Sequence, residues 1–426
     1  MSPIDDHPLR YSLANELHAR PFPVLDIPCS AKFLAIKQPE NAASRDRGLD
    51  RAHLIALLDM HGAPHPQPNA THYSGTIGRH TLKWEQHTEF VTYTAFETSL
   101  SDRPFDTAEF DVFPQDWLDA APGARITSAL VRVAPKPDDR TIIAALEDWF
   151  VPESLAVSSI LDDCAVVAGD FRIDTAGHTR FAVFVNPGTG QRRVGRIVQR
   201  LCEIETYKTM SMLGLSRVRA MAGDMTSLEN NLTGLIANLP RQHANADETL
   251  HTLLSISAEL EGMSARASFR FGATDAYQAL VGQRIGVLRE DRFQGRQTFG
   301  EFMMRRFDPA MRTVKSAQGR LGAMTERATR AADLLRTRVD VERSAQNQDL
   351  LESMDRRADL QLRLQKTVEG LSIVAISYYA LNLVLYILTP FGKEIGIDKL
   401  WLAAIATPLV ILGVWFMVRR IRKAME

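Results

Sequence analysis

Two uncharged segments near the C-terminus decide the architecture: residues 370–388 read GLSIVAISYYALNLVLYIL, and residues 400–418 read LWLAAIATPLVILGVWFMV. Each segment has 19 residues. As a helix it would be about 28 Å long, close to the roughly 30 Å hydrocarbon core of a bilayer. A buried helical hairpin of a soluble protein is the alternative, but apolar segments of this length rarely lack every charge. The sequence therefore predicts two membrane-spanning helices.

Basic residues flank this predicted hairpin on one side. Lys366 precedes the first segment, and Arg419 and Arg420 follow the second, whereas the connecting residues 389–399 contain two lysines balanced by two acidic residues. Positively charged flanks favour the cytoplasmic side of a membrane. Both termini are therefore predicted to lie in the cytoplasm, together with the first 369 residues.

The composition of the whole chain excludes several classes of protein. With 426 residues, 45% hydrophobic and 24% charged, the chain is neither disordered nor collagen-like and is long enough for two or three domains. Its 50 basic and 51 acidic residues give a net charge of −1, which argues against a nucleic-acid partner. Three scattered cysteines provide neither a disulfide framework nor a Cys-x-x-Cys metal site, and they suit a reducing compartment.

Residues 1–190 combine short strand patterns with helical ones. Aromatic and β-branched residues at 81–85 and 89–96 predict a hairpin, and residues 171–173 with 181–183 predict a second one. The pattern as a whole predicts an α+β domain with a mainly antiparallel sheet. Further strands are predicted at 125–133, 164–173 and 179–185, and helices at 43–60 and 141–150.

Strand patterns are absent from the sequence between residues 190 and 369. Pro240 and Pro309 are the only prolines there, and the abundance of Ala, Leu, Arg, Glu and Gln predicts long helices with ion pairs between them. After Pro309 no residue stops a helix, so one continuous helix is predicted over residues 311–388. The expected organisation is an α+β domain at 1–190, a helical, coiled-coil stalk domain at 191–369 and a transmembrane hairpin with a basic cytosolic tail at 370–426.

One face of the first predicted span collects polar residues. The positions recur at alternating steps of three and four and continue a register from the preceding stalk, which indicates contact with other helices. Lipid does not tolerate such a face, so the face indicates either hydrogen-bonded helix contacts or the lining of a pore, which two spans can form only in an oligomer. The face comprises Ser372, Ala375, Tyr379, Asn382, Tyr386 and Thr389, and Glu394 and Asp398 would form acidic rings at the outer mouth.

This order of parts resembles that of the CorA-type divalent-cation channels, in which a cytosolic α/β domain precedes a long stalk helix, a first span, a short outer loop and a second span. The resemblance implies a pentamer whose first span lines the pore, and hence an oligomeric channel or transporter for divalent cations. The Gly-Met-Asn signature of that family is absent, because residues 389–392 read TPFG and residues 379–382 read YALN. A non-conducting, membrane-anchored cytosolic scaffold or sensor is the alternative function.

A second resemblance is carried by residues 7–21, HPLRYSLANELHARP, and residues 84–90, WEQHTEF. The sequence is similar over nearly its full length to an uncharacterised family of bacterial membrane-anchored proteins. This resemblance implies a bacterial membrane-anchored protein, which we expect in the inner membrane. The expected partners are the lipid bilayer and, from the CorA-type layout, further copies of the chain.

The same two motifs contain the candidate metal ligands. Glu85, His87 and Glu89 alternate along a predicted strand and would point to one face, where His18 could join them. The spacing lacks the two histidines, four residues apart on a helix, of a zinc protease, and a solvated sheet face is the simpler interpretation. A divalent metal ion is therefore the one cofactor that the sequence suggests.

Patterns typical of enzymes are missing. Residues 190–197, GQRRVGRI, are predicted to lie between a strand and a helix, but Arg196 and Ile197 stand where a phosphate-binding loop needs Lys and Ser or Thr. No nucleophile elbow, catalytic-triad pattern or dinucleotide fingerprint occurs. The sequence therefore does not predict an enzyme.

Overall fold

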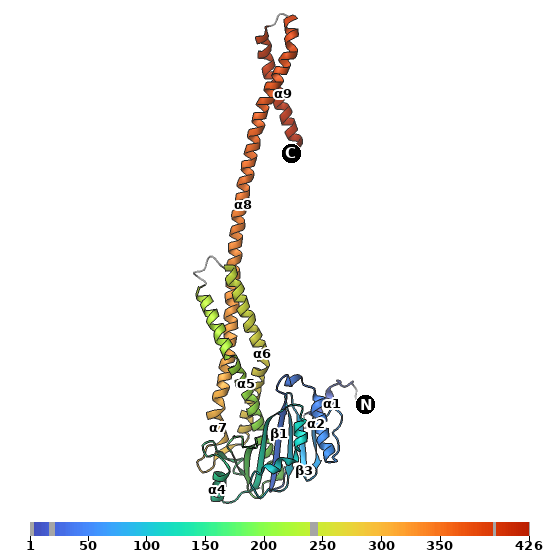
Figure 1. Ribbon diagram of the computed structural model, residues 1–426, viewed down its shortest axis with the longest axis vertical. Coiled ribbons are helices and arrows are strands. Elements are labelled where there is room, and N and C mark those ends of the chain that lie inside the picture. The colour runs from blue at the N-terminus through green and yellow to red at the C-terminus, as the bar shows by residue number, and fades with distance from the viewer. Residues whose placement is uncertain (1–3, 17–21, 239–245, 395–397, 426) are drawn as a thin grey trace. The chain divides into compact units, whose positions relative to one another are not determined.

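The computed structural model contains a mixed sheet, several long helices and two apolar C-terminal helices (Figure 1). It describes residues 4–16, 22–238, 246–394 and 398–425. The chain forms two compact units, which are described separately. The larger unit comprises Met1–Arg241 and His251–Ala331, and the smaller comprises Gln242–Leu250 and Ala332–Glu426.

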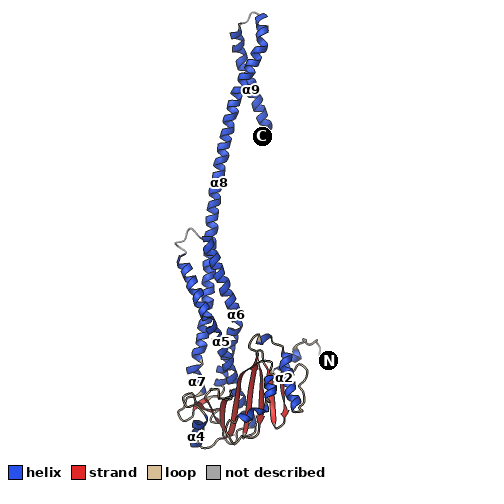
Figure 2. Cartoon of the chain, viewed as in Figure 1, coloured by secondary structure: helices blue, strands red, loops and turns tan. Residues whose placement is uncertain are grey.

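Within the described residues, nine strands form one sheet in the larger unit (Figure 2). Their order is β2-β3-β4-β1-β5-β8-β7-β6-β9, and every neighbouring pair is antiparallel except β5 and β8. The α+β class and the mainly antiparallel sheet are thus confirmed. The strands are β1 (Cys29–Lys37), β2 (His72–Ile77), β3 (His80–Gln86), β4 (Val91–Glu97), β5 (Ala124–Pro135), β6 (Ala156–Ile160), β7 (Ala165–Gly169), β8 (Thr179–Val185) and β9 (Glu290–Arg292).

Helices cover both faces of this sheet. Two of them, α2 and α4, pack on one face, and Asp46 and Asp138 cap their N-termini. On the other face lies α5, with α6 beside it. The helical elements are α1 (Arg10–Glu16), η1 (Ala42–Ser44), α2 (Arg47–Met60), η2 (Thr107–Val112), α3 (Gln115–Asp119), α4 (Asp139–Trp149), α5 (Gln191–Asn238), α6 (Ala246–Gly286), α7 (Phe299–Arg306), α8 (Asp308–Glu394) and α9 (Lys399–Met425).

Glycines let α5 approach its neighbours closely. A Cβ atom on Gly195 would lie 1.7 Å from the Pro23 carbonyl oxygen, and one on Gly214 would lie 2.3 Å from the Thr274 hydroxyl of α6. Any larger residue at these positions would push the helix away from the N-terminal segment or from α6. The segment around Gly195, predicted from the sequence to lie between a strand and a helix, therefore packs closely against the N-terminal segment at Pro23.

The second predicted hairpin, in which residues 171–173 would pair with residues 181–183, is wrong. Residues 171–173 form no strand, and the antiparallel neighbour of β8 is β7. The chain leaves the sheet because Asp170 accepts hydrogen bonds from the backbone N–H groups of Val151 and Arg172, and Phe171 has a φ of +53°. The Phe171 ring stacks on Phe302 of α7, with ring centroids 4.6 Å apart. The apolar residue Phe171 in this loop therefore gave the sequence a strand-like pattern.

The helical part agrees more closely with the sequence. Helix α8 is unbroken from Asp308 to Glu394 and contains the whole helix predicted at 311–388. One short strand, β9, pairs with β6 in a region where only helices were expected. Helix α5 and most of α6 belong to the same compact unit as the sheet.

In the part of the chain that the structure describes, two helices are long and apolar enough to cross a membrane. Only 6% and 11% of the residues in their most apolar stretches are buried, which is unlike the core helix of a soluble protein. Where the two pair within the smaller unit, small side chains are buried: Ser377 of α8, and Ala406 and Val414 of α9, are each 7% exposed. These features support a membrane anchor.

The larger unit also buries a lysine on the face covered by α2. Lys32 is fully buried, and its Nζ lies 2.8 Å from a Glu97 carboxylate oxygen and 3.5 Å from Glu109. Burial alone would raise the pKa of Glu97, but hydrogen bonds from Lys32 and Ser99 and the charges of Lys32 and Arg79 lower it to about 2. The pair therefore depends on an ionised Glu97.

We expect Glu97→Gln to lower the free energy of unfolding by about 3 kcal/mol, because a buried ammonium group loses its nearest carboxylate. Chemical denaturation of the two proteins measures the difference. The matched control is Glu147→Gln, since Glu147 forms an exposed ion pair with Arg296 and should matter by less than about 0.5 kcal/mol. Equal effects of the two substitutions would contradict the role given to the buried pair.

The stability that Glu97 contributes should depend on pH. Its pKa is about 2 in the folded protein against an ordinary 4.5, so the contribution is present above pH 4.5 and is lost as the pH falls toward 2. The difference in unfolding free energy between wild type and Glu97→Gln should therefore be smaller at pH ~3.5 than at pH ~6. A difference that stays constant over this range would show that Glu97 is not held ionised.

Candidate functional site

The polar face of the first span lies opposite to the second span. Helices α8 and α9 cross in the smaller unit (Figure 1), Ser377 of α8 is buried, and Tyr386 follows Ser377 by nine positions, or about two and a half turns. The predicted face is largely uncovered, as are its apolar neighbours: Tyr379 is 70% exposed, Tyr386 is 83% exposed and Ala375 is exposed, while Val374 and Leu383 are 67% and 63% exposed. Ser372, Asn382 and Thr389 flank it and are half-buried.

At the end of this face, the Thr389 hydroxyl donates a hydrogen bond to the Leu385 carbonyl, one turn earlier in α8. Of the two acidic residues expected at the outer mouth, Asp398 is exposed and immediately precedes α9, whose Trp401 N–H donates to its carbonyl at 3.0 Å. Glu394 ends α8, but its side chain lies outside the described part. The structure thus describes one of the two proposed outer carboxylates.

The candidate metal ligands do not alternate along one strand. Strand β3 ends at Gln86 and β4 begins at Val91, so His87 and Glu89 lie in the connecting turn, and the predicted alternation along a strand is wrong. The Glu85 carboxylate is 3.3 Å from the Lys83 ammonium. His18 lies outside the described residues. Among the residues that the structure describes, no group of three or more His, Cys, Asp or Glu side chains is arranged to hold a metal ion.

Glu89 instead anchors the β3–β4 turn to α6. Glu89 is 1% exposed. Its carboxylate pairs with Arg270 and accepts a hydrogen bond from Tyr277 at 3.3 Å. Burial, followed by the charge of Glu89, raises the pKa of Tyr277. On the other side of the turn, Arg45 donates to the carbonyls of His87 and Phe90 at 2.9 and 3.0 Å. The WEQHTEF motif is therefore held from two sides.

A serine and a histidine also meet, in a buried position. Ser128 Oγ and His178 Nδ1 are 2.9 Å apart. The nearby Asp174 carboxylate accepts hydrogen bonds from the backbone N–H groups of Ala176 and His178, each at 2.9 Å, and so is used by its own loop. Both Ser128 and His178 are buried, and the arrangement is typical of a stabilised turn rather than of a catalytic triad.

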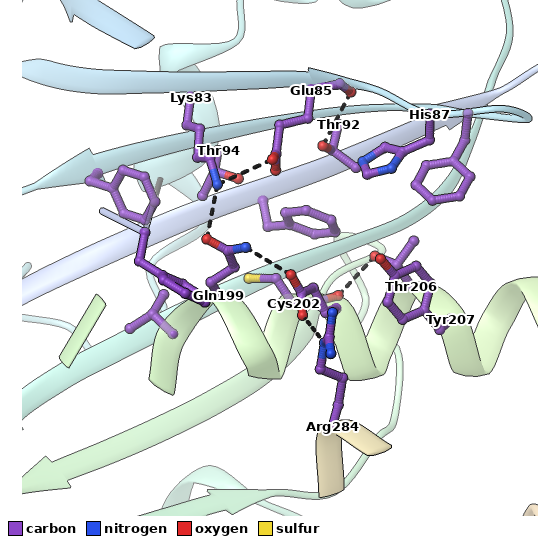
Figure 3. Close-up of a pocket in the computed structure, with 16 residues that line it drawn as sticks. Lys83, Glu85, His87, Thr92, Thr94, Gln199, Cys202, Thr206, Tyr207 and Arg284 are labelled. Atoms are coloured by element: carbon purple, nitrogen blue, oxygen red, sulfur yellow. Dashed lines mark hydrogen bonds and ion pairs between the residues drawn. The ribbon is translucent and has the colours of Figure 1, made fainter. Parts of the chain in front are cut away.

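A cavity of about 250 Å³ lies between the sheet and the helices on the face covered by α5 (Figure 3). Strands β1, β3 and β4 form one wall, α5 forms the other, and α6 contributes one residue. The lining residues are Phe22, Phe33, Lys83, Glu85, His87, Phe90, Thr92, Thr94, Phe96, Val198, Gln199, Cys202, Glu203, Thr206, Tyr207 and Arg284.

Charged and amide side chains cross this cavity wall as a connected series (Figure 3). Lys83 of β3 donates to the Gln199 amide oxygen of α5 at 2.9 Å, and Gln199 donates to Glu203 at 2.7 Å. Glu203 in turn pairs with Arg284 of α6. The series therefore joins the sheet, α5 and α6, and it confirms the predicted ion pairs between helices.

The remaining lining is mostly apolar. Phe33, Phe90 and Phe96 are at most 5% exposed, whereas Phe22 is 45% exposed and lies at the solvent edge. Burial, followed by the charges of Glu203 and Glu205, strongly raises the pKa of the Cys202 thiol, so this cysteine is not a nucleophile. The cavity combines an apolar part with one charged wall, as small-molecule sites do.

Sequence reasoning missed this cavity. Its charged residues come from β3, α5 and α6, and their spacing along the chain gives no pattern. One local signal was present, because Lys83 and Glu85 alternate with the apolar Leu82 and Trp84 on a strand. Such alternation places two opposite charges on one sheet face but does not reveal what faces them.

The fold and these sites define a class: an α+β protein with a helical bundle and two candidate membrane-spanning helices. Over residues 5–425 the chain matches a family described as "Protein of unknown function (DUF3422)", and it therefore belongs to that family. This match confirms the expectation of an uncharacterised family. No curated protein and no solved structure is significantly similar to the chain.

We expect Glu89→Gln to lower the free energy of unfolding by about 3 kcal/mol, because Arg270 would lose its carboxylate in a largely buried site. Lys37 adds to this cost, because Glu89 also stabilises its charge. Burial and the charge of Arg270 lower the pKa of Lys37, whereas the charge of Glu89 raises it. Denaturation of the full chain measures the effect. The control is Glu261→Gln, since Glu261 is an exposed residue of α6, the helix that carries Arg270.

Zn²⁺ binding, measured by calorimetry on the same proteins, should not change with Glu89→Gln. The opposite pattern, in which Zn²⁺ binding is lost and stability is retained, would support the metal interpretation of Glu85, His87 and Glu89 and contradict the structural one.

Proposed function

We propose that the chain is one subunit of a homo-oligomeric membrane protein in which the first spans together line a cation pathway. One observation carries this proposal: the polar face of α8 lies opposite to α9 and is uncovered in the single chain. A channel or transporter for divalent cations is the function that this arrangement supports best.

The argument rests on the cost of polar groups in hydrocarbon. Tyr379 lies at the centre of the first apolar segment, and Asn382 lies one turn further. A tyrosine hydroxyl and a carboxamide at this depth need hydrogen-bond partners from another helix or from water. Because α9 packs on the opposite side, such partners must come from other subunits or from a water-filled path between them.

The order of elements adds support. Helix α8 continues without a break into the first apolar segment, and a short connection leads to α9. This is the layout on which the CorA-type resemblance rests, and that resemblance implies a pentamer. We propose an inner-membrane location with both termini in the cytoplasm, on the basis of the basic residues that flank the hairpin.

The proposed lining is neutral. Hydroxyl and amide oxygens of Tyr379, Asn382 and Thr389 would replace part of the hydration shell of a cation, whereas fixed negative charge would come only from the outer residues Glu394 and Asp398. Lys393 and Lys399 stand beside these two and weaken their field. We therefore treat the divalent cation as a substrate and not as a resident cofactor.

The second candidate function is a membrane-anchored sensor or scaffold that does not conduct. The ligand-sized cavity in the larger unit favours it, because a binding site far from any pore residue in the sequence suits a protein that responds to a cytosolic molecule. In this case the polar face of α8 would only hold subunits together.

The number of subunits and the ion flux test the proposal in turn. Native mass spectrometry of the detergent-purified chain should give an oligomer of at least four or five copies, since fewer first spans cannot surround a pore. A monomer or dimer would contradict the channel and leave the sensor.

In liposomes that contain the purified oligomer, we expect Asn382→Leu to reduce Mg²⁺ flux roughly tenfold, because an apolar ring replaces oxygen ligands. Leu409→Ile serves as the control, since Leu409 is an exposed residue of α9 and should leave flux unchanged. Native mass spectrometry must show that both variants keep the subunit number. Unchanged flux in Asn382→Leu would end the pore assignment.

A further inference from the structure

The cavity between the sheet and α5 offers a second function, which does not depend on conduction. We infer that it binds a small zwitterionic α-amino acid with an apolar side chain. Lys83 would hold the carboxylate of the ligand, Glu85 would hold its ammonium group, and the phenylalanines of the apolar part would enclose its side chain.

The size of the cavity limits the ligand. Its volume of about 250 Å³ is below the range of roughly 300–1,000 Å³ that is usual for drug-sized ligands. A free amino acid fits this space, whereas a nucleotide or a peptide of several residues does not. The solvent edge at Phe22 provides an entrance.

The charges of the lining also limit the ligand. Lys83 is paired with Glu85, and Arg284 is paired with Glu203, so the cations and carboxylates of the wall balance. A phosphate or another strongly anionic group would need unpaired cations or a row of backbone N–H groups. A balanced wall instead favours a ligand that carries one charge of each sign.

The two charges nearest the strands have the spacing that such a ligand requires. Lys83 and Glu85 are two positions apart on one face of β3, with Nζ and Oε1 3.3 Å apart. An α-amino acid carries its carboxylate and ammonium groups on one carbon, so their separation is similar. The zwitterion can therefore lie antiparallel to this ion pair, with each end against the opposite charge.

A hydroxyl stands beside the lysine. Thr94 of β4 lies directly across from Lys83, and Thr92 lies across from Glu85. The Thr92 hydroxyl is 3.4 Å from the Glu85 carbonyl. For the Thr94 hydroxyl, the described residues provide no partner within hydrogen-bond distance, although Thr94 is only 9% exposed and lines the cavity. A ligand carboxylate on Lys83 would supply that partner.

The apolar part of the lining determines the kind of amino acid. Phe33 and Phe96 project from β1 and β4, and Val198 faces them from α5, and all three are buried. Burial of an aliphatic or aromatic side chain would stabilise the bound ligand here, whereas a second charged group would be desolvated without a partner. Leucine and phenylalanine are accordingly the expected class.

A purely structural role is the competing explanation, because the series from Lys83 to Arg284 joins the sheet to two helices. That role accounts for the ion pairs but not for the open space beside them or for the Thr94 hydroxyl. The two explanations differ in their requirement for a ligand, and ligand analogues can separate them.

The experiment uses the full chain in detergent and titrates L-phenylalanine and L-leucine by calorimetry, with the melting temperature as a second readout. We expect saturable binding and a melting temperature that rises with ligand concentration. L-phenylalaninamide lacks the carboxylate and 3-phenylpropionate lacks the ammonium group, so each should bind at least about tenfold more weakly than phenylalanine.

Thr94→Val removes one hydroxyl and keeps the ion pairs, and we expect it to weaken binding several-fold with the melting temperature of the free protein unchanged. Lys83→Met should weaken binding further, and Lys136→Met, which removes a lysine that is paired with Asp163 outside the cavity, is the control. If Lys83→Met does not fold, Thr94→Val still decides the question.

Three results would overturn the inference: no saturable binding of either amino acid, equal binding of the two analogues, or unaltered affinity in Thr94→Val. None of these results bears on subunit number or ion flux, so a failure here and a failure of the proposed channel can be told apart.

Discussion

The structure of the larger unit depends on covering both faces of one broad sheet. Every residue of β1, the strand near its centre, is buried, which is possible only with helices on both sides. One face is covered by α2 and α4, which follow the first strand of each half of the sheet. The other face needs a longer cover, and α5 supplies it, while Gly195 and Gly214 let α5 lie close to the N-terminal segment and to α6.

Covering both faces also buries some polar side chains, and these side chains lie where they have hydrogen-bond or ion-pair partners. Lys32 on the α2 face is neutralised by Glu97 and Glu109. On the α5 face, Lys83 and Glu85 replace apolar residues at the β3–β4 side of the sheet. Helix α5 meets them with Gln199 and Glu203 instead of a close-packed apolar surface, and the cavity lies at this place.

Much of the fold followed from patterns that are local in sequence. Hydrophobic alternation located β3, β4, β5 and β8, and the absence of prolines between Pro309 and Pro390 predicted the long unbroken part of α8. Alternation failed at residues 171–173, where Phe171 is half-buried and stacks on Phe302 of α7 instead of lying in the sheet. The pairing of β5 with β8 and the strand β9 depend on contacts across large sequence separations, which no local pattern reports.

The candidate sites differ in predictability for the same reason. The polar face of α8 lies within one helix, so helical periodicity alone identified its members, and the position of α9 then left Tyr379 and Tyr386 exposed. The proposed metal ligands Glu85, His87 and Glu89 do not alternate on one strand, because His87 and Glu89 lie in a turn, and His18 lies outside the described residues. The cavity could not be predicted, because Lys83, Gln199 and Arg284 meet only after three elements have packed.

The exposed face of α8 also constrains what the membrane part can be. Tyr379 and Tyr386 are seven positions apart, about 10 Å along a helix, so equivalent tyrosines of an oligomer would form two separate layers. In a dry contact between two helices each hydroxyl must find a partner on the facing helix, a condition that a pair of chains can meet. In a ring of several chains the same hydroxyls surround an axis, and water or a cation must satisfy them. In the proposed oligomer, the number of chains therefore decides whether the assembly around the polar face is closed or conducting.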